Sequence, residues 1–372
     1  MIEALKQIAA GIPKFAGESG LRASESEHRF RISDESQKQM ISTVIRTGSD
    51  TRADLHLPSP AIRAHRCVEP DVTGFYDATT GSVQYVVADP VTRRSAIIDP
   101  VLDFDPRSGS TRTTSADRLL RYIEAHGLTL EWILDTHPHA DHFSAAGYLK
   151  DMTGAPTAIG ERVTEVQKLW KQIYDLPDTF PADGSQWDYL FADGERFTIG
   201  EMEAQVMLSP GHTLSSVTYA IGNAGFVHDT VFMPDSGTAR ADFPGGDARQ
   251  LWGSIQRILQ LPGETRLFTG HDYRPSGRAA RWESTVALQK ANNLHLKASD
   301  EAKFVKLRTE RDRSLPMPAL ILAALQVNLA GGRLPAPEAD GRRYLKISLN
   351  AFPHASWDDL EPSLKAEELR GR

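Results

Sequence analysis

The sequence predicts an α/β protein in which β-sheets and helices form layers. Short β-rich runs and amphipathic helical segments follow one another in mixed order, and several neighbouring β-rich runs are spaced as hairpins. A doubly wound parallel sheet would need a regular alternation of single strands and helices, which this chain does not have. In addition, turns rich in histidine and aspartate come directly after predicted strands, which places a candidate site at one edge of the sheets.

Local patterns define the individual elements. Runs rich in β-forming residues and bounded by turns predict strands at residues 82–88, 95–98, 128–134, 202–208, 216–221, 225–228 and 266–269. Ser115 is the expected N-cap of a helix that ends near Gly127. Helical spacing of apolar residues predicts further helices at residues 143–151, 162–174, 248–261 and 282–293.

Three regions differ in composition. Residues 1–66 are rich in Ser, Arg, Asp and Glu, and we expect a weakly ordered N-terminal extension. Residues 67–300 carry the predicted strands and helices and form the expected main domain. Residues 301–372 are expected to be a helical and extended tail that packs on this domain.

Composition excludes several classes of protein. The chain has 372 residues, of which 40% are hydrophobic, so it can fill a sizeable core. Its 42 basic and 49 acidic residues form no basic block, so a nucleic-acid partner is not expected. Cys67 is the single cysteine, which excludes an intrachain disulfide and favours a reducing cytoplasm. The longest apolar stretch, residues 319–325, is shorter than the ~20 residues of a membrane span, so no membrane insertion is expected.

The clearest chemical signal lies at the end of a predicted strand, where His137, His139, Asp141 and His142 occur within six residues. In an extended loop alternate side chains point the same way, so His137 and His139 can face one cation. Asp141 and His142 fall where a helix is predicted to begin, and can turn toward a neighbouring position. Imidazole and carboxylate groups are common ligands of transition metals, and the segment therefore predicts a metal site.

Three more candidate ligands follow predicted strands. A Ser-Pro-Gly turn precedes His212, Asp229 ends a strand, and His271 follows another. Taken singly, each is more often a loop residue or a hydrogen-bonded core histidine. Strand ends on one edge of a sheet converge, however, and this shared position favours a common site.

Together, the HxHxDH segment and the downstream His212, Asp229 and His271 resemble the metallo-β-lactamase superfamily over roughly residues 68–290. The resemblance implies an αββα sandwich, with two mixed β-sheets flanked by helices and the metal at one edge. All seven metal positions of the superfamily are occupied, as in dinuclear hydrolases such as glyoxalase II. The ligand set alone therefore does not distinguish one metal ion from two.

Two further segments resemble the persulfide dioxygenase branch of this superfamily: the loop at residues 235–246 and, for the bacterial members, the tail at residues 315–350. This resemblance implies one catalytic Fe(II) per chain, held by His137, His212 and Asp229. Two histidines and one carboxylate form the facial triad of non-haem iron oxygenases. The remaining candidates would orient ligands and water by hydrogen bonds: His139, Asp141, His142 and His271. The implied reaction converts glutathione persulfide, dioxygen and water to sulfite and glutathione, in sulfide detoxification.

The resemblance also implies substrate-binding residues. Arg240 would hold a substrate carboxylate with its two-pronged guanidinium, and the alternative is a salt bridge to Asp242 or Asp235. Tyr273 matches a tyrosine of the family that contacts the glutathione part.

Three positions depart from the family pattern. His228 stands where glycine usually precedes the ligand aspartate, and strand alternation should turn it away from Asp229, so a structural role is expected. Ala241 occupies a position that is often cysteine or threonine, and Trp252 replaces an expected tyrosine. These two changes leave the identity of the thiol open.

Two other functions compete with this interpretation. A dinuclear enzyme with two Zn²⁺ ions would hydrolyse thioesters or lactones with a bridging hydroxide, and the complete ligand set supports it. A catalytically silent binding protein is disfavoured because no ligand has been lost. The sequence assigns no role to Cys67 and leaves the oligomeric state open, with a homodimer as one outcome.

Overall fold

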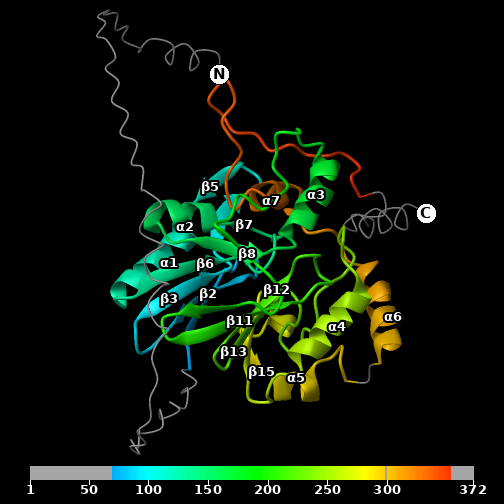
Figure 1. Ribbon diagram of the computed structural model, residues 1–372. Helices are drawn as coiled ribbons and strands as arrows, with labels where there is room; N and C mark the ends of the chain where they lie inside the picture. The colour runs from blue at the N-terminus through cyan, green and yellow to red at the C-terminus, as the bar shows by residue number, and fades with distance from the viewer. Residues whose placement is uncertain (1–68, 298–299, 353–372) are drawn as a thin grey trace, which may run out of the picture. The chain divides into compact units, whose positions relative to one another are not determined.

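The computed structural model describes residues 69–297 and 300–352, and two six-stranded sheets dominate it (Figure 1). The first sheet has the order β1-β2-β3-β6-β8-β9. Its strands are β1 (Asp71–Tyr76), β2 (Val83–Ala88), β3 (Arg94–Ile98), β6 (Thr129–Leu134), β8 (Thr157–Gly160) and β9 (Tyr189–Phe191). Strands β1 to β3 pair antiparallel, whereas β3, β6, β8 and β9 pair parallel, so the sheet is mixed.

The second sheet has the order β10-β11-β12-β13-β14-β15 and is also mixed, because β13 and β14 pair parallel within an otherwise antiparallel arrangement. Its strands are β10 (Arg196–Ile199), β11 (Met202–Leu208), β12 (Val217–Ile221), β13 (Ala224–His228), β14 (Arg266–Thr269) and β15 (Glu283–Thr285). A small third sheet joins β5 (Ser110–Arg112), β4 (Val101–Asp105) and β7 (Phe143–Ser144).

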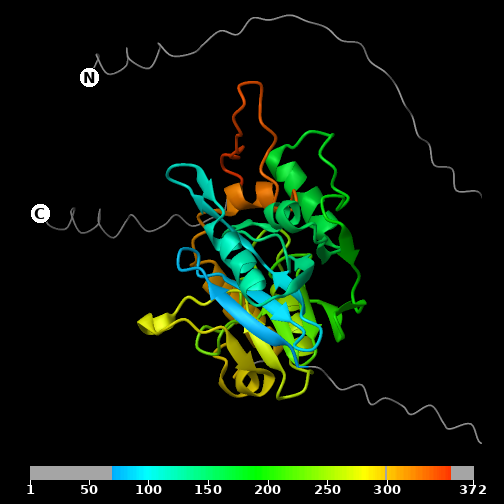
Figure 2. The same ribbon diagram turned by 90° about the vertical axis from the view of Figure 1, so that its left-hand side faces the viewer.

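Helices cover the outer faces of the two large sheets (Figure 1). The helices are α1 (Thr114–Ala125), α2 (Ala146–Thr153), α3 (Val163–Tyr174), α4 (Ala248–Ile258), α5 (Val286–Asn292), α6 (Glu301–Asp312) and α7 (Ile321–Asn328). In the view turned by 90°, the β4–β5 hairpin and the segment that follows α7 project from the same end of the molecule (Figure 2). Among the described residues, no helix combines the length and hydrophobicity that a bilayer span requires.

Strand alternation explains how these layers hold together, because successive side chains point to opposite faces of a sheet. Val87 and Ile98 pack between the sheets against Tyr219 and Phe226 of the second sheet. Their neighbours Val86 and Ile97 face the other way, against Leu119 of α1 and Leu149 of α2. On the far side, α4 packs Leu251 and Ile255 against Val227 and Leu267. The αββα sandwich expected from the sequence is confirmed.

Most predicted strands occur within two residues of their expected positions, but four helix boundaries were wrong. Ser115 is not an N-cap: α1 begins at Thr114 after Thr113, and the backbone N–H and hydroxyl of Ser115 donate to Asp103. The helix expected at residues 143–151 begins only at Ala146, because Phe143–Ser144 pairs with β4.

The helix expected at residues 282–293 is also shorter, since Glu283–Thr285 forms β15 beside β14, and Thr285 then caps α5. Similarly, α4 ends at Ile258 rather than at residue 261. The late starts of α2 and α5 share one cause: local periodicity does not reveal pairing with a strand that is distant in sequence.

The C-terminal helices pack on the sandwich. Phe304 of α6 contacts Trp252 of α4, with ring centroids 5.2 Å apart. From α7, Ala324 and Val327 join the apolar cluster beneath the first sheet. The expected extension at residues 1–66, Cys67 and the end of the tail lie outside the described residues.

Candidate metal centre

Four loops that follow strands meet at one edge of the sandwich. His137 follows β6, His212 follows β11, Asp229 follows β13 and His271 follows β14. The ligand atoms of His137, His212 and Asp229 lie within 4.8 Å of one another, and all three residues are at most 5% exposed. The structure thus brings together the two histidines and the carboxylate that the sequence singled out as metal ligands.

The surroundings of His137 and His212 favour the neutral imidazole, which can bind a cation through a nitrogen lone pair. His212 Nδ1 lies 2.9 Å from the carbonyl oxygen of Arg240, and donation to that oxygen leaves Nε2 with its lone pair. His137 Nε2 is buried and has no hydrogen-bond partner among the described residues. A buried nitrogen without a partner destabilises the folded state unless a ligand satisfies it. Burial lowers the pKa of both imidazoles, which favours the neutral form that a metal requires.

His139 is tied to the first sheet through Asp99. Its Nε2 lies 3.0 Å from Asp99 Oδ1, and Asp99 also accepts hydrogen bonds from the backbone and hydroxyl of Thr136 at 2.7 and 2.8 Å. Burial alone would lower the pKa of His139, but the adjacent Asp99 carboxylate raises it to about 9. His139 Nδ1 is buried without a partner. Asp99 therefore fixes the orientation of the HxHxDH loop.

Asp141, His142 and His271 contact one another beside the triad. Asp141 Oδ2 lies 2.6 Å from His271 Nε2, 2.7 Å from Ser82 Oγ and 2.9 Å from His142 Nδ1. His271 Nδ1 in turn lies 2.6 Å from Asp229 Oδ1, so this imidazole bridges two carboxylates. Burial would lower the pKa of His271, but Asp141 and Asp229 outweigh it and raise this pKa well above its usual value.

Besides Asp99, sequence reasoning missed two residues that shape the centre. Ser82 is buried and its hydroxyl also lies 3.1 Å from His271 Nε2, yet nothing in its local sequence indicates this role. Asn328 of α7 donates to the carbonyl oxygens of His139 and His142 at 2.7 and 2.8 Å, and accepts from the Ser144 backbone N–H at 2.7 Å. A buried amide at the end of the apolar run of α7 was the signal that could have indicated it, although Gln326 in the same helix shares that residue chemistry.

His228 has the structural role that was expected. Its Nε2 lies 3.0 Å from Ser209 Oγ and 2.9 Å from Thr230 Oγ1, so it supports the neighbouring turns. Its backbone has a φ of 38°, in the left-handed region that glycine adopts most easily, so this conformation is compatible with the glycine that the family resemblance led us to expect there. Gly270 has a different constraint, because a Cβ at that position would lie 2.5 Å from Asp229 Oδ1.

A cavity of about 590 Å³ lies over the metal centre, within the size range of small-molecule sites. Asp141, His212, Asp229 and His271 line it on the side of the centre. Its other walls combine apolar and cationic groups: Phe232, Phe243, Tyr273, the run at residues 315–319, Arg240, Arg308 and Arg311. Such a lining suits an anionic ligand with apolar parts.

The guanidinium of Arg240 lines this cavity but is already engaged. Its Nε and Nη2 lie 2.7 and 2.8 Å from the two oxygens of Asp242. Nη1 donates to the carbonyl oxygen of Pro316 at 2.5 Å, and Nη2 to that of Leu315 at 3.3 Å. Asp235, the other partner that the sequence suggested, pairs instead with Arg278. The two-pronged side of Arg240 therefore faces Asp242.

Tyr273 lies at the rim of the same cavity and is 60% exposed. Its ring stacks on His271, with centroids 5.5 Å apart and planes at 9°. The exposed part of the ring is available to a ligand.

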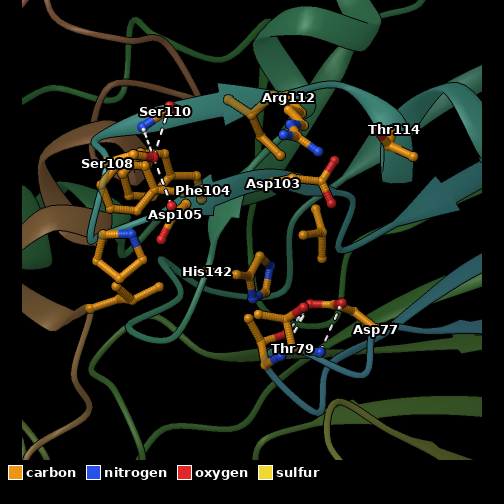
Figure 3. Close-up of a pocket in the computed structure, with 16 residues that line it drawn as sticks. Asp77, Thr79, Asp103, Phe104, Asp105, Ser108, Ser110, Arg112, Thr114 and His142 are labelled. Atoms are coloured by element: carbon orange, nitrogen blue, oxygen red, sulfur yellow. Dashed lines mark hydrogen bonds between the residues drawn. The ribbon is translucent and has the colours of Figure 1, made fainter.

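A second cavity of about 540 Å³ lies beside His142, under the β4–β5 hairpin (Figure 3). Its carboxylates are engaged in local turns: Asp77 accepts from Thr79 and Thr80, and Asp105 accepts from Ser108. These acids thus stabilise the walls of the cavity, and the arrangement does not by itself define a ligand.

Comparison with known proteins places these features in a family. The chain is 68% identical to a "Beta-lactamase hydrolase-like protein" of Xylella fastidiosa over 77% of this chain and 67% of that protein. It is 47% identical to "Glyoxylase B2" of Dictyostelium discoideum over 74% of this chain and 96% of that protein. It is 27% identical to the human "Persulfide dioxygenase ETHE1, mitochondrial" over 69% of this chain and 87% of that protein.

A solved structure and a family model agree with these matches. The crystal structure of ETHE1 from Myxococcus xanthus superposes with a TM-score of 0.57 and 28% identity, covering 71% of this chain and all of that one. The model of the metallo-beta-lactamase superfamily matches residues 80–271, more than half of the chain, and includes every candidate ligand described above. The chain belongs to the metallo-beta-lactamase superfamily.

Proposed function

We propose that this protein is a persulfide dioxygenase that uses one Fe(II) per chain. The observation that carries the proposal is the gathering of His137, His212 and Asp229 within 4.8 Å, beneath a cavity that a substrate can enter. An Fe(II) ion held there would supply the redox chemistry that a reaction with dioxygen needs. The 27% identity to the human persulfide dioxygenase supports the same chemistry.

The hydrogen bonds around Asp141 favour one metal ion over two. Its Oδ2 receives three contacts from Ser82, His142 and His271, and His271 also contacts Asp229. In this arrangement the residues that would hold a second metal ion form hydrogen bonds with one another instead. They hold Asp229 in place and keep its other oxygen toward His212, at 3.7 Å.

The proposed substrate is glutathione persulfide or a related low-molecular-weight persulfide in the cytoplasm. In the reaction the S–S bond breaks, and the outer sulfur gains two oxygen atoms from dioxygen and one from water. The products are the thiol, sulfite and two protons, so atoms and charge balance. The protein contributes binding and orientation: Tyr273 and the apolar walls offer contact surface to the substrate, while Asp99 and Asn328 fix the loop that carries His137.

A dinuclear zinc hydrolase of thioesters or lactones is the second candidate. His139 Nδ1 and His142 Nε2 are buried without a partner among the described residues, and both could serve a second cation. The names of two relatives, the "Beta-lactamase hydrolase-like protein" at 68% identity and "Glyoxylase B2" at 47%, also favour a hydrolase.

Metal analysis together with two substrate assays separates the candidates. Protein purified without added metal should contain about one iron per chain, should consume oxygen with glutathione persulfide, and should leave S-lactoylglutathione intact. Glutathione itself should give no oxygen uptake, since it lacks the outer sulfur. Two zinc ions per chain with thioester hydrolysis and no oxygen uptake would establish the hydrolase instead.

A further inference from the structure

The wall of the cavity that faces the metal centre comes from a segment beyond the region that the family model matches. Arg308 and Arg311 of α6 and the run at residues 315–319 line it, whereas the family model ends at residue 271. We call this lining the C-terminal wall. Because it differs in origin from the metal loops, it is the part of the site where specificity for a substrate can be set independently of the chemistry.

Direct hydrogen bonds fasten the C-terminal wall to the loop that orients His212. The backbone N–H of Ala241 donates to Asp312 at 2.9 Å, and Arg308 donates to the carbonyl oxygen of Thr238 at 3.2 Å. Arg240 reaches from the same loop to the carbonyl oxygens of the wall, while its own carbonyl oxygen accepts from His212. The wall and the metal ligand are therefore held at a fixed distance.

Two of the three guanidinium groups in the cavity have structural partners. Arg240 makes a two-pronged ion pair with Asp242. Arg308 is 1% exposed and forms a buried ion pair with Asp312, one turn further along α6. A carboxylate that approached either group would compete with a bond already formed inside the protein, and neither group is therefore a strong candidate for substrate recognition.

Arg311 differs from both. It is exposed and lines the cavity, and its guanidinium has no hydrogen bond or ion pair with any other residue in the ranges 69–297 and 300–352. We propose that Arg311 binds the carboxylate of an anionic thiol-derived substrate, and that Arg240 instead fixes the wall in place. This inference rests on the proposed function for the kind of substrate. It revises the sequence-based expectation that Arg240 is the carboxylate ligand.

Binding of glutathione, measured by calorimetry on the metal-loaded full chain, tests this role without relying on turnover. Arg311→Gln removes the charge and keeps much of the side-chain length. Arg313→Gln is the matched control, because it removes the same charge two residues away from a side chain that does not line this cavity. Glutathione dimethyl ester, which lacks both free carboxylates, is the second probe.

We expect Arg311→Gln to weaken glutathione binding about three- to tenfold, as one exposed charge-assisted contact would, and to leave binding of the ester unchanged. The control should stay within about twofold, Arg311→Lys should recover part of the loss, and added salt should shrink the difference. In oxygen uptake the same change should appear in KM rather than kcat.

Equal binding of glutathione by the Arg311→Gln and Arg313→Gln variants would overturn the assignment, as would an equal loss with the ester. A failure of the proposed function looks different: the wild type would bind glutathione in an Arg311-dependent way but would consume no oxygen with any persulfide.

Discussion

At the scale of single residues, His212 shows how the metal centre depends on its surroundings. Its Nδ1 is committed to the Arg240 carbonyl oxygen and its Nε2 lies 3.7 Å from Asp229 Oδ2, so the imidazole has one orientation and one free lone pair. His142 is held differently, through Nδ1 to Asp141. The two histidines should therefore respond differently to substitution.

We expect His212→Ala to abolish retention of the metal, because it removes one of three ligands. The His142→Ala variant should retain most of the metal and should differ from the wild type mainly in activity. Metal content after gel filtration in metal-free buffer checks both. Loss of half of a two-metal complement in His142→Ala or His271→Ala would show that the mononuclear assignment is wrong.

Gly270 offers a second test at this scale. A Cβ there would lie 2.5 Å from Asp229 Oδ1 and 3.1 Å from the carbonyl carbon of His228, so Gly270→Ala must displace the ligand carboxylate. We expect weaker metal retention and a loss of stability of about 1–3 kcal/mol. Gly253→Ala in α4 is the control, since its Cβ would meet nothing within 4 Å, and it should be neutral or stabilising. Equal metal content in both variants would contradict the account.

At the scale of elements, α7 fixes the HxHxDH loop although it lies far from it in the sequence. The amide of Asn328 makes three buried hydrogen bonds, to the carbonyl oxygens of His139 and His142 and to the Ser144 N–H. The loop between β6 and β7 has little regular pairing of its own. Helix α7 therefore satisfies the backbone groups of this loop, which a neighbouring strand would satisfy in a sheet.

Asn328→Ala should leave these three backbone groups unsatisfied, which costs about 2–4 kcal/mol of unfolding free energy. Faster loss of metal to a chelator should accompany this change. Gln326→Ala is the control, because the Gln326 amide on the same helix contacts Lys346 at the surface rather than the histidine loop. Denaturant unfolding and chelator kinetics measure the two effects, and equal values for both variants would exclude the proposed role of Asn328.

At the scale of the whole molecule, local patterns of strands and histidines predicted α/β layers and a metal site. The resemblance to a known superfamily implied the αββα sandwich and the triad of His137, His212 and Asp229. The sequence offered Asp242 as one of two possible partners of Arg240, as found, but it could not predict the roles of Ser82 and Asn328. Each of these depends on a contact between segments brought together only by the fold. The same limit explains why β7 and β15 were assigned to helices.

The loops of the centre come from both sheets, so a bound metal should stabilise the whole fold rather than one element. Removal of the metal with a chelator should lower the Tm of the wild type, and added Fe(II) should restore it. His212→Ala should show no such response to Fe(II). A wild-type Tm that is independent of metal would place the cation outside the centre described here.

The central claim is tested most directly by the yield of sulfite per dioxygen consumed, measured with glutathione persulfide and protein that holds one Fe(II) per chain. The account predicts about one sulfite for each dioxygen, as the balanced reaction requires, and no sulfite with His137→Ala. The absence of both oxygen uptake and sulfite from the iron-loaded wild type, together with hydrolysis of a glutathione thioester by the zinc form, would contradict it.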